Sequence, residues 1–366
     1  MKIDRVQIFA TAAPLSPPVV TARGRFDQRV GALVRLVDEA GVEGFGEAAP
    51  WPGFGGHGAR FEAALEALRA ADPAHWGVLR SPEAAADVAA SMGSPEVAFA
   101  VEVALLDLLG RRLGKSVAGL LCEAPRGRVE VHALVNSAEE AARARSAGFG
   151  RFKVKVGLDG DEARVASIRE AIGQGALRLD ANGAWSAQEA IERLGRLSRY
   201  GIELVEQPVK ANDIAGLARV RAEAGVPVAA DEALTGIEAL ESLIEAEAVD
   251  AIVLKPAFTG GIGVARRMAR RAASAGIGVM VTHALEGVVG RLAALHLAAS
   301  LPGPLLACGL GGPRLEVEGE QGAGGPVEQS EGWARRVERW PRPCAAGGWV
   351  EVPQGAGLCG EPGVGR

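Results

Sequence analysis

The 366-residue chain has few of the residues that build structural metal sites or disulfide frameworks. It contains only 4 cysteines and 5 histidines, and its aromatic content is 4%. The cysteines form no Cys-x-x-Cys pair and have no histidines at zinc-finger spacing. These absences argue against a zinc-finger or disulfide-rich protein, and we expect free thiols in a reducing compartment.

Long apolar runs and basic patches are also missing. No run approaches the roughly 18 apolar residues of a membrane helix, and the initial MKIDRVQIFA lacks the apolar core of a secretory signal. Lysine and arginine total 40 against 45 acidic residues, which gives a net charge of −5. No basic stripe interleaved with aromatics is present. We therefore expect a cytoplasmic protein that binds neither membranes nor nucleic acid.

Charged residues recur at a nearly constant spacing in the middle of the chain. Lys155, Asp180, Glu206, Asp231 and Lys255 are separated by 25, 26, 25 and 24 residues. Each closes a short run rich in Val, Leu and Ile, and a stretch with helical spacing follows. A strand-then-helix unit of this length predicts an α/β fold of the (β/α)8 TIM-barrel type, in which catalytic groups lie at the carboxyl ends of the strands.

The rest of the chain does not follow this spacing, so we predict three parts. Residues 1–125 read as an α+β capping domain, because alternating apolar runs and turns are followed by two helical stretches. The second of these helices starts at a Ser-Pro-Glu signal and ends at Gly114. Residues 126–320 hold the barrel, and the Gly- and Pro-rich residues 321–366 return to the capping domain. The eight expected barrel strands are VEVHALVN (129–136), FKVKV, LRLDA, IELVEQ, VPVAAD, AIVLK, GVMVTH and one near PLLACG.

Two lysines lie close together in the second barrel strand. Lys153 and Lys155 are two residues apart, so their side chains point to the same side of the sheet. Paired ammonium groups repel each other, which makes a neutral lysine accessible near neutral pH, and a neutral lysine is a base. The alternative is a pair of surface lysines at a frayed edge, but Phe152, Val154 and Val156 are all apolar.

Three acidic residues end successive strands. Asp180, Glu206 and Asp231 should lie about 5 Å apart laterally, and three unpaired carboxylates at that spacing repel strongly. A hard divalent cation such as Mg²⁺, with Mn²⁺ as the alternative, relieves the repulsion through oxygen coordination. The competing interpretation is that these residues pair with barrel lysines or cap the following helices.

Lys255 ends the sixth expected strand, and Lys155 ends the second. Four strands separate them, so in a closed eight-stranded barrel they face each other across the mouth. A cation held between two such lysines stabilises an enolate made from a carboxylate substrate, while either lysine moves a proton on its own face.

The succession KVK, DANG, VEQP, ADEA and LKP resembles the enolase superfamily, in its muconate-cycloisomerase-like subgroup. The resemblance covers nearly the whole chain. Within that subgroup, GFGEAAPWPGF, RLDANGAW, VLKPAFTGGI and THALEGVVG are most similar to the o-succinylbenzoate synthase family of menaquinone biosynthesis.

This resemblance implies roles for individual residues. Asp180, Glu206 and Asp231 would bind Mg²⁺, Lys155 would remove the proton α to the substrate carboxylate, and the charge of Lys255 would stabilise the enediolate. The implied enzyme is a carbon–oxygen lyase whose partner is a small carboxylate: it eliminates water in syn fashion from a 2-succinyl-6-hydroxy-cyclohexadiene-1-carboxylate. The positions that would accompany this machinery are Lys153, Asn182, Glu232 and Arg178, and backbone N–H groups for the succinyl carboxylate would come from Gly260, Gly261 and Gly287.

Other reactions of the subgroup stay open. N-acylamino acid racemases and muconate-type cycloisomerases use the same two lysines and metal. Dipeptide epimerases usually carry Asp-x-Asp near the eighth strand, where this chain reads LLACGLGGPRL, which counts against them. An inactive barrel kept as a scaffold would lack a ligand or a lysine, and none is missing.

His283 ends the seventh expected strand, where mandelate-racemase-like members hold a catalytic histidine. That role needs an aspartate on the sixth strand, and this chain has Lys255 there. We therefore expect His283 to be a pocket or structural histidine that lies near the substrate. Specificity is expected to depend on capping loops around Arg23, Phe54 and His57.

Overall fold

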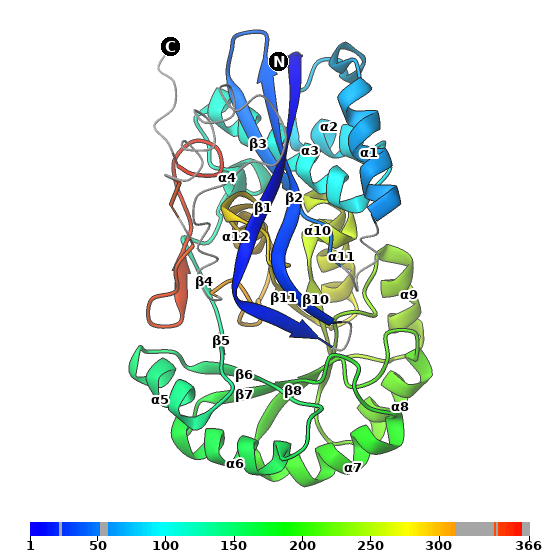
Figure 1. Ribbon diagram of the computed structural model, residues 1–366, viewed down its shortest axis with the longest axis vertical. Helices are drawn as coiled ribbons and strands as arrows, with labels where there is room; N and C mark the ends of the chain where they lie inside the picture. The colour runs from blue at the N-terminus through cyan, green and yellow to red at the C-terminus, as the bar shows by residue number, and fades with distance from the viewer. Residues whose placement is uncertain (22–23, 52–57, 312–339, 342, 361–366) are drawn as a thin grey trace.

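The computed structural model describes residues 1–21, 24–51, 58–311, 340–341 and 343–360, and it has two parts (Figure 1). One part is a three-stranded antiparallel sheet covered by helices. The other is a curved ring of parallel strands surrounded by helices. The α/β barrel with an N-terminal α+β capping domain is confirmed.

The capping sheet has the strand order β1-β2-β3 and is antiparallel throughout, as the alternation of apolar residues predicts. β1 and β2 form a long hairpin that extends from the capping domain toward the barrel (Figure 1). The capping elements are β1 (Ile3–Thr21), β2 (Gly24–Asp38), β3 (Glu43–Ala48), α1 (Gly58–Ala70), the 3₁₀ turn η1 (Pro73–Trp76), α2 (Pro82–Ala90), α3 (Pro95–Leu113) and α4 (Val117–Leu121).

Helix α3 forms the centre of the capping domain, and nearly all of its side chains are buried. It begins after Ser94 with proline in its first turn and ends at Gly114 in the left-handed conformation, with φ of 64°, as predicted. The strand β3 packs against it so closely that a Cβ on Gly46 would lie 1.8 Å from the carbonyl oxygen of Ala100. Glycine is required there because no side chain fits.

Seven parallel strands form the barrel sheet in the order β5-β6-β7-β8-β9-β10-β11. Helices alternate with the strands and cover the outside of the ring (Figure 1). β4 (Arg128–Glu130) precedes this sheet and does not belong to it. The elements of the ring are β5 (Ala133–Leu134), α5 (Ala138–Ser146), β6 (Arg151–Lys155), α6 (Asp161–Ile172), β7 (Ala176–Asp180), α7 (Ala187–Leu197), η2 (Ser198–Tyr200), β8 (Ile202–Glu206), α8 (Ile214–Glu223), β9 (Val228–Ala230), α9 (Ile237–Glu245), β10 (Ala251–Leu254), α10 (Pro256–Thr259), α11 (Ile262–Ser274), β11 (Gly278–Val281) and α12 (Val288–Ser300).

The predicted eighth strand is reduced to a short extended segment, residues 306–309, which closes the ring. On one side Leu306 N–H donates to Val279 and Gly309 N–H donates to Val281. On the other side Cys308 N–H donates to Glu130, at 2.8 Å. The segment thus bridges β11 and the beginning of the barrel sheet, although it is too short to count as a strand.

Side chains along the barrel strands alternate between two apolar environments. Phe152, Leu179 and Val205 point outward into the main core under the helices. The inward positions form a separate small cluster made of Leu204, Ala229, Ala251, Val253 and Met280, with Leu306 beside it. Charged residues that share the inward phase therefore project into the barrel rather than toward the helices.

Two buried carboxylates of the capping domain hold the barrel helices. Glu102 of α3 accepts a hydrogen bond from Gly263 N–H at 2.8 Å, in the first turn of α11. Glu47 of β3 accepts from the N–H groups of Gly287 and Gly290 at the start of α12. Each carboxylate satisfies backbone donors that the helix itself leaves unpaired. The two domains are thereby joined at the loops that follow β10 and β11.

The described part of the C-terminal segment lies against both parts of the fold. β12 (Trp349–Glu351) pairs antiparallel with β4. Leu358 N–H donates to Asp107 of α3 at 2.8 Å, and the ring of His296 in α12 contacts the Leu358 carbonyl oxygen at 2.9 Å. Among the helices of the described residues, none combines the length and apolarity that crossing a membrane requires.

Glu102 gives the joint between the domains a pH-dependent stability. Burial raises the pKa of Glu102 to about 7, well above the usual range of a glutamate, although hydrogen bonds from Gly263 and Ile262 oppose this shift. A carboxyl group that binds its proton more tightly in the folded state contributes its full stability below its unfolded pKa and loses it as pH rises through the folded value. Glu102→Gln should remove this loss.

We therefore predict that the free energy of unfolding falls less between about pH 5 and about pH 8 in Glu102→Gln than in the wild type, by up to about 3 kcal/mol. Urea unfolding at the two pH values measures the difference. The exposed Glu62 of α1 supplies the control, since Glu62→Gln should keep the wild-type dependence. Equal pH dependence in Glu102→Gln and the wild type would contradict the assignment.

Candidate active site

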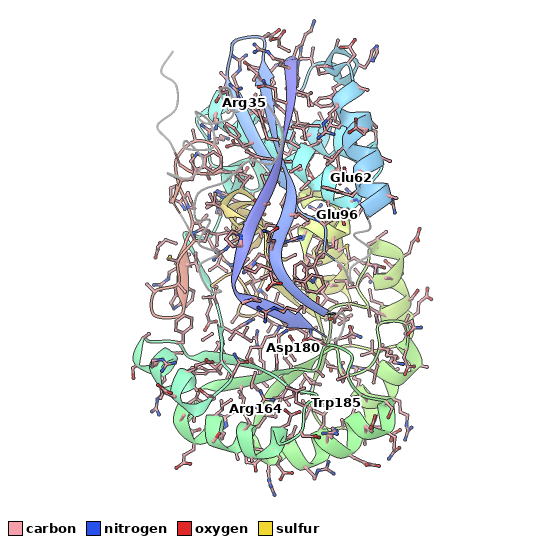
Figure 2. All side chains as sticks on the ribbon, viewed as in Figure 1. Arg35, Glu62, Glu96, Arg164, Asp180 and Trp185 are labelled. Carbon is pink, nitrogen blue, oxygen red and sulfur yellow. The ribbon has the colours of Figure 1, made fainter. Side chains whose placement is uncertain are left out.

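The five evenly spaced charged residues lie at the carboxyl ends of adjacent barrel strands. Lys155 is directly opposite Asp180 in the β6–β7 pairing, and Asp180 is directly opposite Glu206 in the β7–β8 pairing. Asp231 and Lys255 follow the last residues of β9 and β10. Figure 2 labels Asp180 on the side of the barrel toward the β1–β2 hairpin. The structure thus brings these residues to one end of the ring.

Lys153 lies one pleat below Lys155 and is bound to two of the carboxylates. Its ammonium is 2.7 Å from Glu206 and 3.0 Å from Asp180. Burial alone would lower the pKa of Lys153, but the charges of Asp180, Glu206 and Asp231 together raise it above its usual range. Lys153 is therefore a permanent cation, and repulsion from Lys155 does not make it neutral.

Lys155 has a different environment although it belongs to the same strand. Its side chain is half-buried, and within the described residues its ammonium makes no hydrogen bond or ion pair. It is nonetheless near enough to Asp180 for its charge to act on that carboxyl group. Of the two lysines, Lys155 is the one whose amine is open to a substrate.

Lys255 approaches the site from the other side of the barrel. Its ammonium donates a hydrogen bond to Asp231 and is 2.6 Å from that carboxylate. β10 is four strands away from β6 in the sheet, so Lys255 and Lys155 reach the mouth from separate walls. The strands that carry the three carboxylates lie between the strands of these two lysines.

The three carboxyl groups differ in pKa although all are buried. Burial raises the pKa of Glu206 to about 7, opposed by Lys153 and assisted by repulsion from Asp180 and Asp231. Burial raises the pKa of Asp231 to about 6, opposed by Lys255 and assisted by Glu232. Burial would also raise the pKa of Asp180, but the nearby lysines hold it below its usual value. Part of the cost of ionising this cluster is mutual repulsion.

The donor set can be tested for its fit to a divalent cation. All three side chains supply hard oxygen ligands, and Glu232 adds a buried oxygen, Oε2, that has no hydrogen-bond donor in the described residues. As the side chains stand, no three His, Cys, Asp or Glu residues in the described part of the chain surround a common point at coordination distance. Lys153 and Lys255 hold the carboxylates instead. The ligand type and the uncompensated charge fit Mg²⁺.

Gln207 supports the site and was not singled out by sequence reasoning. It follows Glu206, has a positive φ of 40°, and is completely buried. Its side-chain oxygen accepts hydrogen bonds from the N–H groups of Asp231 and Ala233 at 3.0 and 3.1 Å. The side chain thus fixes the turn that carries Asp231. The only signal for this role was the position of a polar residue beside Glu206 in VEQP.

The accompanying residues occupy two levels of the barrel. Asn182, with φ of 44°, donates to Glu232 at 3.2 Å and links the turns after β7 and β9. Arg178 lies one pleat deeper than Asp180 and is almost wholly buried. Its guanidinium donates to Glu203 and, at 2.6 Å, to the carbonyl of Ala307. It ties the closing segment of the barrel to β7.

The glycines expected to bind the succinyl carboxylate have backbone contacts within the protein. Gly261 N–H donates to Pro256 at 3.0 Å. Gly260 has φ of 94° and ends α10, where its N–H donates to the same carbonyl. Gly287 N–H donates to Glu47. In this structure these three donors are used by the protein itself and are not open to a substrate carboxylate.

His283 is buried beside the loop that follows β11. Its Nδ1 accepts a hydrogen bond from Leu285 N–H at 3.1 Å, so the ring is neutral and carries its proton on Nε2. Burial lowers the pKa of His283 to about 3, with help from the charges of Arg291, Lys255 and Arg29. Glu286, 4.0 Å away, therefore faces a neutral ring rather than an imidazolium. The capping-loop residues Arg23, Phe54 and His57 lie outside the described residues.

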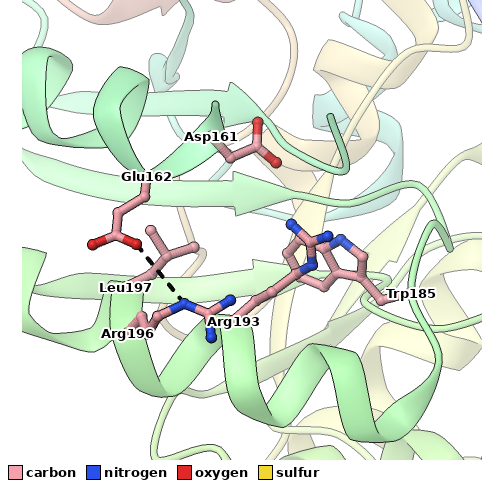
Figure 3. A pocket seen from close by; sticks show the side chains of 6 residues that line it. All are labelled: Asp161, Glu162, Trp185, Arg193, Arg196 and Leu197. Carbon is pink, nitrogen blue, oxygen red and sulfur yellow. Dashed lines mark ion pairs between the residues drawn. The ribbon is translucent and has the colours of Figure 1, made fainter. Parts of the chain in front are cut away.

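A small cavity of about 30 Å³ lies away from these residues, between α6 and α7 (Figure 3). Its lining includes Asp161, whose carboxylate accepts from the N–H groups of Gly157 and Leu158 in the loop after Lys155. None of the five charged site residues lines this cavity, so it is not the centre of the chemistry. The cavity is lined by Asp161, Glu162, Trp185, Arg193, Arg196 and Leu197.

Several proteins whose names give a reaction resemble this chain in sequence or in structure. The hydrophobic dipeptide epimerase of Enterococcus faecalis is 31% identical over 82% of this chain and 88% of its own length. Its structure in complex with Mg and the dipeptide L-Leu-L-Tyr has a TM-score of 0.80 and 27% identity, covering 98% of this chain and 99% of that one. The N-succinyl-L-Arg/Lys racemase of Bacillus cereus is 30% identical over 82% of this chain and 85% of its own length.

The o-succinylbenzoate synthase of Thermobifida fusca is 41% identical, over 52% of this chain and 61% of its own length. These relatives are named for different reactions, so their similarity does not identify the reaction of this chain. The family models agree with each other: residues 3–122 match the mandelate racemase / muconate lactonizing enzyme N-terminal domain, and residues 136–362 match the enolase C-terminal domain-like family. The resemblance seen in the sequence is confirmed, and the chain belongs to the enolase superfamily of enzymes.

Proposed function

We propose that this protein is a Mg²⁺-dependent carbon–oxygen lyase that dehydrates 2-succinyl-6-hydroxy-cyclohexadiene-1-carboxylate to o-succinylbenzoate. The observation that carries the proposal is the contrast between two lysines of one strand. Lys153 is held as a cation by two carboxylates, whereas the Lys155 amine has no partner in the described residues. A base needs such an open amine within reach of the substrate.

Asp180, Glu206 and Asp231 are the residues that would hold the cation. When bound, Mg²⁺ would supply positive charge at the substrate carboxylate, where negative charge develops as the α proton leaves. Glu232 and Asn182 would help to orient the three metal ligands from the neighbouring turns, because they are hydrogen-bonded to each other at 3.2 Å. Lys153 would remain a fixed charge beneath the carboxylates.

Lys155 would perform both proton transfers. Its neutral amine takes the α proton, and the electron pair of the broken C–H bond moves into the substrate carboxylate, giving an enediolate. The ammonium of Lys255 offsets the new charge from the other wall of the barrel. When the electron pair returns, the C–O bond breaks, and Lys155 gives its proton to the departing hydroxide, which leaves as water. The proton enters and leaves on one face, as a syn-elimination requires.

The surroundings favour a substrate that carries carboxylates and no ammonium group. Residues 304–311, which include the short segment that closes the ring, contain no Asp or Glu to hold a free amine. The 41% identity to the Thermobifida fusca synthase adds support for the succinyl substrate. The neutral His283 would contribute a hydrogen-bond donor, Nε2–H, near the Lys255 side of the site.

N-succinylamino acid racemisation is the second candidate. The Bacillus cereus racemase resembles 82% of this chain, and its substrates also carry a succinyl group by name. In that reaction Lys155 and Lys255 would act on opposite faces of one carbon, so that one removes the proton and the other returns it. A muconate-type cycloisomerase would use the same lysines and ranks behind both.

The substrate that the purified protein turns over distinguishes between these candidate reactions. We predict that purified protein with Mg²⁺ converts the cyclohexadiene substrate to o-succinylbenzoate, followed by the ultraviolet absorbance of the aromatic product. Racemisation of N-succinylamino acids, followed by polarimetry, is the parallel assay. Racemisation without dehydration would replace the first proposal with the second.

Removal of the open amine tests the base. We predict that Lys155→Ala lowers kcat by at least about 100-fold, because general-base catalysis contributes roughly 100- to 10,000-fold and no other described amine shares its position. The exposed Lys210 supplies the matched control, and Lys210→Ala should turn over at the wild-type rate. Circular dichroism verifies the fold of both variants. Substantial turnover by Lys155→Ala would exclude it as the base.

Removal of one carboxylate tests the metal site. Asp231→Asn should weaken Mg²⁺ binding by at least about 10-fold, since the loss of an anionic ligand costs no less than the loss of a group that merely orients one. Isothermal titration calorimetry measures the affinity directly. Asp159→Asn, at an exposed position in the loop after β6, is the control. Identical Mg²⁺ affinities for Asp231→Asn and the wild type would remove Asp231 from the ligand set.

A further inference from the structure

Arg29 of β2 is a buried guanidinium that binds backbone carbonyls in two parts of the fold. Only 5% of the residue is exposed. Its Nε and one Nη2 hydrogen bond reach the carbonyls of Leu285 and Ala284 in the barrel, both at 3.1 Å. Its remaining bonds reach the carbonyls of Ala49 and Pro50 in the capping domain. One side chain therefore joins the segment after β3 to the loop after β11.

The aromatic side chains beside Arg29 belong to the same joint. Its guanidinium lies 5.0 Å from the ring centroid of Trp51, and Trp51 in turn lies 4.8 Å from Phe26. A guanidinium stacked on an aromatic face is held in orientation as well as in position. Arg29 thus fixes the point at which the capping segment leaves β3.

The barrel side of the joint includes an unusual backbone conformation. Leu285 has φ of 63°, in the left-handed region that a leucine rarely adopts. Its carbonyl accepts from Arg29, and its N–H donates to Nδ1 of His283. The conformation of this one residue therefore directs its carbonyl to the arginine and its N–H to the histidine. Release of the Leu285 carbonyl would free this backbone to relax, and the hydrogen bond that fixes the imidazole would be lost.

Among the described residues, acidic groups surround Arg29 without forming a direct ion pair with it. Glu286, Glu47 and Glu96 all act on it electrostatically, and they partly offset the desolvation that lowers its pKa. Glu47 binds the N–H groups at the start of α12, and Glu286 accepts from Ala284 N–H. The loop from His283 to Gly287 is thus held at its carbonyls by a cation and at its N–H groups by anions.

We propose that Arg29 is a positioning residue, which fixes the capping segment Ala49–Trp51 to Ala284 and Leu285 and, through Leu285, holds His283 as an Nε2–H donor toward the substrate. The inference rests on the proposed function for the identity of the substrate, but not for the arrangement of the loop. Within the described residues Nε2 has no hydrogen-bond partner, so this donor is open. The hydrogen bonds of Arg29 within the described residues go to backbone carbonyls and not to the carboxylates of the site.

Lysine should not replace arginine in this role. The N–H donors of the guanidinium lie in one plane and reach four carbonyls. An ammonium has three donors in a tetrahedral arrangement and cannot span both segments. Arg29→Lys keeps the charge and loses the geometry. Arg29→Met removes both the charge and the hydrogen bonds but retains an apolar stem of similar length.

The full-length protein tests the proposal in two ways. Steady-state kinetics, with whichever substrate it turns over, should show kcat/KM lowered by about 10- to 100-fold in both Arg29 variants, mainly through KM, because a substrate contact is misplaced. ¹⁵N NMR of histidine-labelled protein at neutral pH should show the unprotonated Nδ1 of His283 at its hydrogen-bonded position in the wild type. Both variants should lose this hydrogen-bonded signal, because the resonance of a bare Nδ1 without a donor moves downfield. His283→Gln assigns the signal among the 5 histidines.

Arg35 supplies the control, since it belongs to the same strand and pairs with Glu43 and Gln7 within the capping sheet. Arg35→Met should keep both the kinetics and the His283 signal. An unchanged His283 signal in the Arg29 variants overturns the proposal, whatever the kinetics, and so does its loss in Arg35→Met. If Arg29→Met does not fold, Arg29→Lys decides. The NMR measurement needs no substrate, so it stands even if the dehydration assay fails.

Discussion

Repulsion among three buried carboxylates is the constraint on which the mouth of this barrel depends. Asp180, Glu206 and Asp231 lie on neighbouring strands, and burial makes each of them costly to ionise. Lys153 and Lys255 reduce that cost by direct contact, while the charge on Lys155 acts on Asp180 from a distance. A carboxylate cluster that needs more positive charge than its own lysines provide is a cluster suited to a divalent cation.

The sequence predicts this mouth because strand geometry is local. A period of two residues places every second side chain in the barrel, and a repeat of about 25 residues returns the chain to the same rim. From Phe152 and Val154 pointing outward it follows that Lys153 and Lys155 point inward, and the structure agrees. The capping meander and the limits of α3 were predictable for the same reason, since alternation, a Ser-Pro start and Gly114 are features of adjacent residues.

Contacts between distant residues could not be predicted in this way. The sequence does not distinguish the two lysines of β6, because both occupy inward positions of the same strand. Only the packing of three strands shows that Lys153 binds the carboxylates. Gln207 was visible as a residue but not as a support for Asp231, because its hydrogen bonds cross to the next strand. Glu47 and Arg29 reach barrel positions more than 200 residues away in the chain, at separations of 240 and 256 residues, and no local pattern encodes such pairs.

These long-range contacts bear on where substrate specificity is located. A helix N-terminus offers free N–H groups to an anionic substrate, and the glycines before α11 and α12 suggested that use. In the structure, Glu102 and Glu47 occupy those positions with carboxylates from the capping domain. Two helix N-termini of the barrel that could bind an anion are therefore used to hold the capping domain. The distal part of a substrate must then be recognised by side chains. In the proposed function, His283 and the segment that Arg29 anchors contribute to this recognition, and the joint between the domains then takes part in substrate binding.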